Sequence, residues 1–164
     1  MARIAHDQEL IPSVLDRLID YEPEKTREPV KSRSQVLREM KLSVRRDLEN
    51  LLNTRWRCVA WPPDLKQLEL SLVNYGIPDF TGANMGAASD REGLRRVVEE
   101  VIRRFEPRFK SVRVEIAKNA DEADRTLRFR INALLHAEPA PEPVTFSSEL
   151  DPTSTNFAVE TEAR

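Results

Sequence analysis

The sequence has few of the residues that carry chemistry in small proteins. It contains one cysteine and two histidines among 164 residues. A single cysteine excludes an intramolecular disulfide framework, and neither histidine stands at metal-ligand spacing from another histidine or cysteine. We therefore expect a reducing, cytoplasmic setting, no metal ion and no cofactor.

Long apolar runs and catalytic motifs are also missing. No stretch approaches the roughly 20 apolar residues that a membrane span requires, and residues 1–13 lack the apolar core of a signal peptide. Three of the four glycines lie within residues 74–88, yet neither GxGxxG nor GxxxxGK[ST] occurs. No GxSxG pattern is present, and Cys58 has no nearby histidine to activate it. These absences disfavour membrane insertion, nucleotide binding and an enzyme.

Charge is abundant but uneven along the chain. Charged residues make up 33% of the sequence and the net charge is −2. Residues 137–164 hold six acids against one base, a net charge of −5, and the rest of the chain has a slight excess of bases. So small an excess is not the basic surface that nucleic-acid binding requires. We expect protein partners and no nucleic acid.

The first 33 residues are predicted to form an amphipathic helix on a tether. Residues 21–33 carry two prolines and many charges, which is typical of a linker. Within residues 8–20, apolar side chains recur at helical spacing and form one face, which includes Ile11, Val14, Leu15 and Leu18. The pattern leaves open whether this helix packs back on its own domain or binds a partner.

A single domain is predicted for residues 34–164. Apolar residues at steps of three and four predict a long helix over residues 34–53 and a second long helix that ends at Phe105. Ser89 and Asp90 are the candidate N-caps of the second long helix.

Strands are predicted to follow the helices. Strict alternation of apolar and polar residues predicts a hairpin from residues 112–116 and 127–135. Short acidic strands are expected within residues 143–160, and the prolines beside them predict a place at the sheet edge. The fold class is therefore α+β, with N-terminal helices packed on a small, mainly antiparallel C-terminal sheet.

Glu106, Pro107 and Arg108 stand between the last helix and the first strand. Pro107 is expected to stop the helix, because it lacks the N–H and biases Glu106 away from helical angles. One interpretation is a local corner, in which Glu106 and Arg108 satisfy each other or the backbone. The other is a binding surface, in which Arg108 offers its planar five-donor fork to a partner and Phe109 is an apolar anchor. Residue chemistry alone favours the local corner and leaves the second interpretation open.

Four segments resemble the family of phage baseplate-wedge, lysozyme-like proteins that includes the TssE subunits of type VI secretion systems. They occur in the family's order: PSVLDRLID (12–20), SVRRDLENLLNTR (43–55), SLVNYGIPDFTG (71–82) and RFEPRF (104–109). The resemblance implies a structural, non-enzymatic component of a contractile baseplate, in hetero-oligomeric contact with wedge subunits and sheath proteins. The family's Glu-Pro-Arg motif falls on Glu106, Pro107 and Arg108, which implies assembly contacts there.

The resemblance also implies how partners would be held. The strands of residues 111–136 and 143–160 would exchange strands with the sheath and so nucleate its assembly, while the N-terminal helix would bind the wedge. Arg108→Ala would then weaken assembly and leave the isolated fold nearly unchanged. Two alternatives stay open: a regulatory module similar to the bacterial stress anti-adaptor of the same superfamily, and a muramidase-like enzyme, for which no acid stands out above Glu106.

Overall fold

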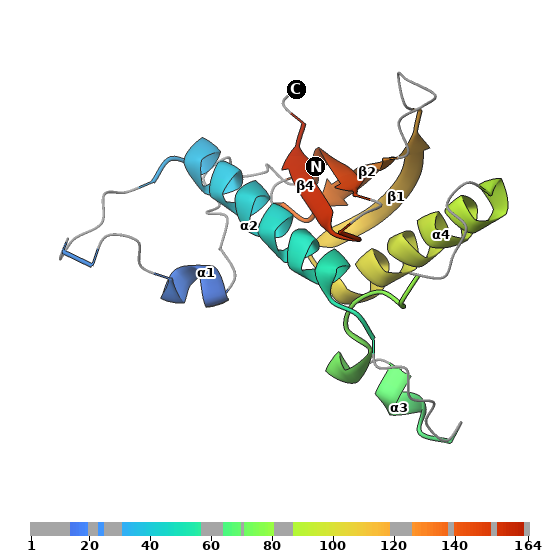
Figure 1. Cartoon of the computed structure of the whole chain (residues 1–164). Helices are drawn as coiled ribbons and strands as arrows, with labels where there is room; N and C mark the ends of the chain where they lie inside the picture. Colours follow the sequence, from blue (N-terminus) through green and yellow to red (C-terminus); the bar gives the residue numbers. More distant parts are fainter. Residues whose placement is uncertain are drawn as a thin grey trace, which may run out of the picture.

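Helices occupy the first part of the chain and strands the second (Figure 1). The computed structural model describes residues 14–19, 23–24, 31–56, 64–69, 71–80, 87–118, 126–137, 140–151 and 154–162, without the side chains of Arg17, Lys66 and Glu69. The elements in chain order are α1 (Val14–Leu18), α2 (Arg33–Asn53), α3 (Lys66–Glu69), the 3₁₀ helix η1 (Leu72–Asn74), α4 (Ala88–Phe105), β1 (Phe109–Ala117), β2 (Leu127–Leu135), β3 (Glu142–Leu150) and β4 (Phe157–Thr161). The predicted α+β class is confirmed.

The four strands form one antiparallel sheet in the order β1-β2-β3-β4. Two long helices lie against it, with α2 beside β4 and α4 beside β1 (Figure 1). The predicted hairpin is present, with Val114 opposite Ile131 in its register. Each outer strand therefore has one long helix as its neighbour.

The core lies between the helices and one face of the sheet. Period-two alternation turns every second strand residue inward, where it meets the apolar stripes of the helices. The largest fully buried side chains are Phe129, Phe146, Leu48, Leu52, Ile77, Ile102, Ile131, Leu135, Val44, Val98, Val114 and Val159. Within the described residues, no helix is long and apolar enough to cross a bilayer.

The two long helices begin in different ways. Ser32 caps α2 in a capping box with Gln35, whose side chain accepts from the Ser32 N–H at 2.7 Å. The N-cap of α4 is Ala87, which makes no side-chain cap bond. The prediction of Ser89 or Asp90 as the cap is therefore wrong, because both lie inside the first turn. There the Asp90 carboxylate still stabilises the helix through its interaction with the helix dipole.

The expected edge position of the late strands is wrong for β3, which pairs with β2 on one side and β4 on the other. Pro143 is tolerated because β4 is short and pairs only with Phe146–Leu150. The Thr145 carbonyl accepts from the Glu162 N–H at 3.0 Å, so the backbone of Thr145 points toward β4. Alternation turns Pro143 the same way, beyond the end of β4, where no ladder bond is lost.

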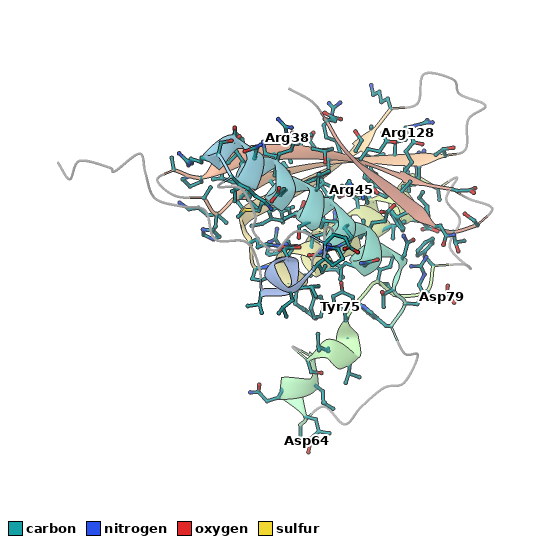
Figure 2. All side chains as sticks on the ribbon, turned by 90° about the vertical axis from the view of Figure 1, so that its left-hand side faces the viewer. Arg38, Arg45, Asp64, Tyr75, Asp79 and Arg128 are labelled. Atoms are coloured by element: carbon teal, nitrogen blue, oxygen red, sulfur yellow. The ribbon has the colours of Figure 1, made fainter. Side chains whose placement is uncertain are left out.

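Gly76 lets the chain after η1 pass close to the end of α2. Its φ is +108°, and a Cβ there would overlap the backbone of Thr54. The Ile77 N–H donates to the Thr54 carbonyl at 2.9 Å, and the Trp56 N–H donates to the Ile77 carbonyl at 3.0 Å. Helix α3 projects away from the body (Figures 1 and 2), with Asp64 beside its outer end in Figure 2.

Candidate protein-interaction site

The turn from α4 into β1 is closed by backbone bonds on both sides of Pro107. The Glu106 N–H donates to the Ile102 carbonyl at 2.9 Å and caps the C-terminus of α4. The Phe109 N–H donates to the Glu106 carbonyl at 3.2 Å. Pro107 lies between them, exposed to solvent, and has no N–H that could continue the helix.

Arg108 is bonded on every side of its guanidinium. Nε and Nη2 donate to the two carboxylate oxygens of Glu106 at 2.7 and 2.5 Å. Nη2 also donates to Asp47 Oδ2 at 2.7 Å, and Nη1 donates to Ser43 Oγ at 3.1 Å. The Arg108 carbonyl accepts from the His136 N–H at 2.7 Å. These contacts fasten the corner to α2 and to the end of β2.

The same contacts continue across α2 to the N-terminal helix α1. Ser43 Oγ donates to the Asp16 carboxylate, with oxygen distances of 2.8 and 2.7 Å. Arg46 Nη2 donates to Asp16 Oδ1 at 3.0 Å, and Arg46 Nε donates to Asp47 Oδ1 at 3.2 Å. One polar cluster, here called the corner network, therefore joins three segments that are distant in sequence; its members are Asp16, Ser43, Arg46, Asp47, Glu106 and Arg108.

Each charged group of the corner network lies next to an opposite charge of the same chain. Burial lowers the pKa of the Arg108 guanidinium, but hydrogen bonds and charge from Glu106, and then from Asp47, outweigh burial and hold that pKa above its ordinary value. The hydrogen bond to Asp16 is the largest influence on Arg46 and raises its pKa. Since every charged group faces an opposite charge at bonding distance, the arrangement is typical of a structural ion-pair cluster.

The structure supports the local interpretation of the corner, because Glu106 and Arg108 bond to each other. The Arg108 fork goes to Glu106, Asp47 and Ser43, where the second interpretation had it open to a partner. Phe109 is half-buried, with its ring centroid 6.3 Å from that of Phe146. A partner-binding role for residues 106–109 stays a prediction.

Helix α1 presents apolar side chains to solvent. Val14 is 73% exposed, Leu15 56% and Leu18 75%. Ile11, the fourth predicted member of this face, lies outside the described residues. Within the described residues, Asp16 of α1 makes polar contacts with Ser43 and Arg46 of α2. The predicted apolar face is therefore available in the isolated chain, and its role in binding a partner stays a prediction.

The sequence analysis missed four members of the network: Asp16, Ser43, Arg46 and Asp47. The signal for two of them was present, because Ser43 and Asp47 stand four residues apart on α2, next to the buried positions Val44 and Leu48. Polar residues at the border of a buried stripe often need a partner. Asp16 gave no comparable signal, since an acid on the polar face of a predicted amphipathic helix is usually explained by solvation.

Comparison with known proteins identifies the family of this chain. Residues 38–140, more than half of the chain, match the family model described as baseplate wedge protein gp25. The chain belongs to the gp25 baseplate wedge family. The family named by the sequence resemblance is thereby confirmed. The gp25 match spans most of α2, all of α4, the Glu106–Arg108 corner and the β1–β2 hairpin, and it leaves α1, β3 and β4 outside.

The chain is also similar to a chain in a solved structure described as "The baseplate complex from the type VI secretion system", with 21% identity and a TM-score of 0.48. The alignment covers 70% of this chain and 96% of that chain. No curated protein sequence matches the chain.

Proposed function

We propose that this gp25-family protein is a structural component of the baseplate of a contractile type VI secretion machine. It would join wedge subunits to the sheath, nucleate sheath assembly and work in the cytoplasm without catalysing a reaction. The family match over residues 38–140 is the observation that carries this proposal. The type VI assignment rests on the four sequence segments that resemble the TssE subunits.

In this proposal residues 1–33 act as a tethered binding element apart from the domain of residues 34–164. The supporting observation is the exposed apolar face of Val14, Leu15 and Leu18, which Ile11 would extend by one turn. An amphipathic helix that lays such a face in a groove is a common mode of peptide recognition. The wedge would supply the groove.

The corner would serve assembly mainly by positioning other groups. Glu106 is buried, so it contributes through Arg108 and does not touch a partner itself. Arg108 holds α2, and Ser43 on α2 holds Asp16 of α1, so the corner network sets where the apolar face of α1 lies. Direct contact with a wedge subunit would come from the exposed Pro107 and the partly exposed Phe109.

Co-purification with the products of neighbouring genes tests the proposal. Val14→Ser/Leu18→Ser removes two exposed apolar side chains, and we expect the wild type to form a heteromeric complex that this variant loses, with an unchanged melting temperature. Leu72→Ser is the matched control, because Leu72 is 81% exposed but lies on η1. We expect the Leu72→Ser variant to keep the heteromeric complex.

Two outcomes would count against the baseplate role, and a third would count only against the role of α1 in it. No complex with any wedge or sheath protein would overturn the baseplate role. Capture of one regulatory protein in place of an assembly would favour the anti-adaptor alternative. A complex that survives Val14→Ser/Leu18→Ser would keep the baseplate role and remove α1 from it.

A further inference from the structure

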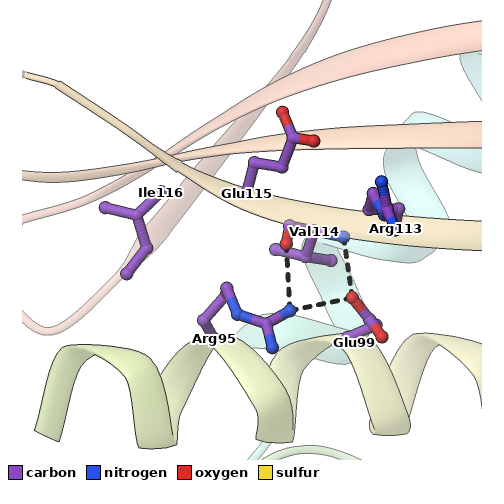
Figure 3. Close-up of a pocket in the computed structure, with 6 residues that line it drawn as sticks. All are labelled: Arg95, Glu99, Arg113, Val114, Glu115 and Ile116. Carbon is purple, nitrogen blue, oxygen red and sulfur yellow. Dashed lines mark hydrogen bonds and ion pairs between the residues drawn. The ribbon is translucent and has the colours of Figure 1, made fainter. Parts of the chain in front are cut away.

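Helix α4 bonds to β1 through charged side chains, but core packing fixes its place. The Val114 N–H donates to Glu99 Oε2 at 3.0 Å, and Arg95 Nη1 donates to the Val114 carbonyl at 3.0 Å, beside an open hollow of about 470 Å³ (Figure 3). The inner face of the same helix buries four apolar side chains in the core: Leu94, Val98, Val101 and Ile102. The contact with Val114 therefore adds to a position that the apolar stripe already determines.

Helix α1 is docked in the opposite sense, with its acid toward the body. The Asp16 side chain is 18% exposed, whereas Val14, Leu15 and Leu18 are 56% to 75% exposed. The backbone of α1 runs closely beside none of the other described helices and strands. An amphipathic helix that packs on its own domain usually turns its apolar face inward. A different interaction therefore orients α1.

The groups that receive Asp16 on α2 are preset for a carboxylate. Ser43 Oγ lies 2.8 and 2.7 Å from the two Asp16 oxygens, and Arg46 Nη2 donates to Oδ1 at 3.0 Å. Ser43 Oγ also accepts from Arg108 Nη1 at 3.1 Å and from Arg46 Nη2 at 3.4 Å. Since these donors use its lone pairs, the single hydroxyl hydrogen of Ser43 needs an acceptor, and Asp16 supplies it. Ser43 and Arg46 are here called the Asp16 socket.

Helix α1 is too short to be stable without a contact of this kind. It has five residues, and the Ile19 N–H donates to the Leu15 carbonyl at 3.1 Å. Isolated helices shorter than about 12 to 15 residues are marginal in water. The Asp16 socket supplies bonds from outside the helix, and they reach the one acid that α1 contains. The order of α1 therefore depends on Asp16.

We propose that Asp16 is the positioning residue of α1, and that α1 is a folded, outward-facing helix only while Asp16 occupies the Asp16 socket. When Asp16 leaves the socket, α1 loses its helix, and a partner that binds the helix must then also order it, which weakens binding. The socket therefore regulates how strongly the apolar face of α1 binds. The partner of that face rests on the proposed function; the order of α1 does not.

Amide hydrogen exchange at Ile19 in the full chain tests the order of α1. The wild-type amide should exchange more slowly than the same amide in an unfolded chain. Asp16→Ala should speed this exchange about fivefold or more, and so should Ser43→Ala, which leaves the sequence of α1 unchanged. If Ser43→Ala lowers the melting temperature, Arg46→Ala repeats the test from the same side of α2. An unprotected Ile19 amide in the wild type, or unchanged exchange in the Asp16 or the α2 variant, would overturn the inference.

Two control variants separate the Asp16 contact from other causes. Glu99→Ala removes the comparable contact of α4, and the Glu106 amide, which donates to the Ile102 carbonyl at 2.9 Å, should stay protected. Ile19 is half-buried, so Ile19→Ala tests whether apolar packing holds α1. After correction for intrinsic exchange rates, Ile19→Ala should speed exchange at position 19 less than Asp16→Ala does. The reverse order would overturn the role of Asp16.

Binding to the complex that the wild type captures in co-purification tests the regulation. Asp16→Ala and Ser43→Ala keep all apolar side chains of α1, and each should raise the dissociation constant about fivefold or more, because less of the chain presents a folded α1. Wild-type affinity in both variants, with a deprotected Ile19 amide, would overturn the regulatory role. If the wild type captures no complex, the proposed function fails, and the exchange results still decide whether Asp16 orders α1.

Discussion

Arg108→Ala is the substitution for which the structure most clearly changes the expectation from sequence. Removing the Arg108 side chain takes away both side-chain donors to the Glu106 carboxylate. The Glu106 side chain is only 5% exposed. Asp47 keeps its bond to Arg46, and Ser43 keeps its bond to Asp16. The Glu106 carboxylate is therefore the group that loses the most stabilisation.

The magnitude follows from burial. Removing one partner of a buried ion pair costs about 3 to 5 kcal/mol, because the other charge stays desolvated. The Arg108 side chain is 23% exposed, and water in the vacated space would solvate part of the stranded charge. We therefore expect the free energy of unfolding to fall by about 3 kcal/mol, at the low end of that range.

Urea unfolding at pH 7 measures this loss, and two further variants fix its cause. Arg96→Ala removes an arginine that is 73% exposed and should cost less than about 0.5 kcal/mol. Adding Glu106→Gln to Arg108→Ala should restore part of the stability, since a neutral amide is less costly to bury than a lone carboxylate. A cost below about 1 kcal/mol for Arg108→Ala, or no recovery with Glu106→Gln, would refute the ion-pair reasoning and favour an Arg108 used in assembly.

Two further predictions concern backbone geometry and pH. Gly76→Ala should lower the free energy of unfolding by about 2 kcal/mol or more, because φ is +108° and Thr54 blocks a Cβ. Gly93→Ala, on the open face of α4, should raise the free energy of unfolding by about 0.5 to 1 kcal/mol. Thermal melts of the two variants and the wild type measure both changes. The Val114 N–H is the main cause that lowers the pKa of Glu99 below 4.5. The stability advantage of wild type over Glu99→Gln should therefore be full near neutral pH and shrink in urea titrations as pH falls below about 4.5.

Local patterns in the sequence predicted most of the architecture. Apolar steps of three and four gave the two long helices, and strict alternation gave the β1–β2 hairpin, because each period places one face in the core. The pattern did not show that β3 would be an inner strand. That position depends on how far β4 extends, and Pro143 is compatible with it only because β4 stops short.

These local patterns did not predict contacts between residues that are distant in sequence. Residue chemistry ranked the pairing of Glu106 with Arg108 first, since the two stand two positions apart at a proline corner. It did not predict that Asp47 and Ser43 complete the Arg108 contacts or that Asp16 joins them. These partners lie 27 to 65 residues apart in sequence, and only the packing of α1 and the corner on α2 brings them together.

The sequence by itself determined the fold class, the ends of the longest elements within a few residues and the family, because these depend on local periodicity and on short segments in a fixed order. Only the tertiary structure decided which charges are used internally and which backbone groups at the sheet edge bond to side chains of a helix. A side chain's free donors and acceptors depend on which distant segments lie within hydrogen-bond reach. Arg95 and Glu99 belong to a helix that periodicity predicts, but their contact with Val114 exists only because α4 lies along β1.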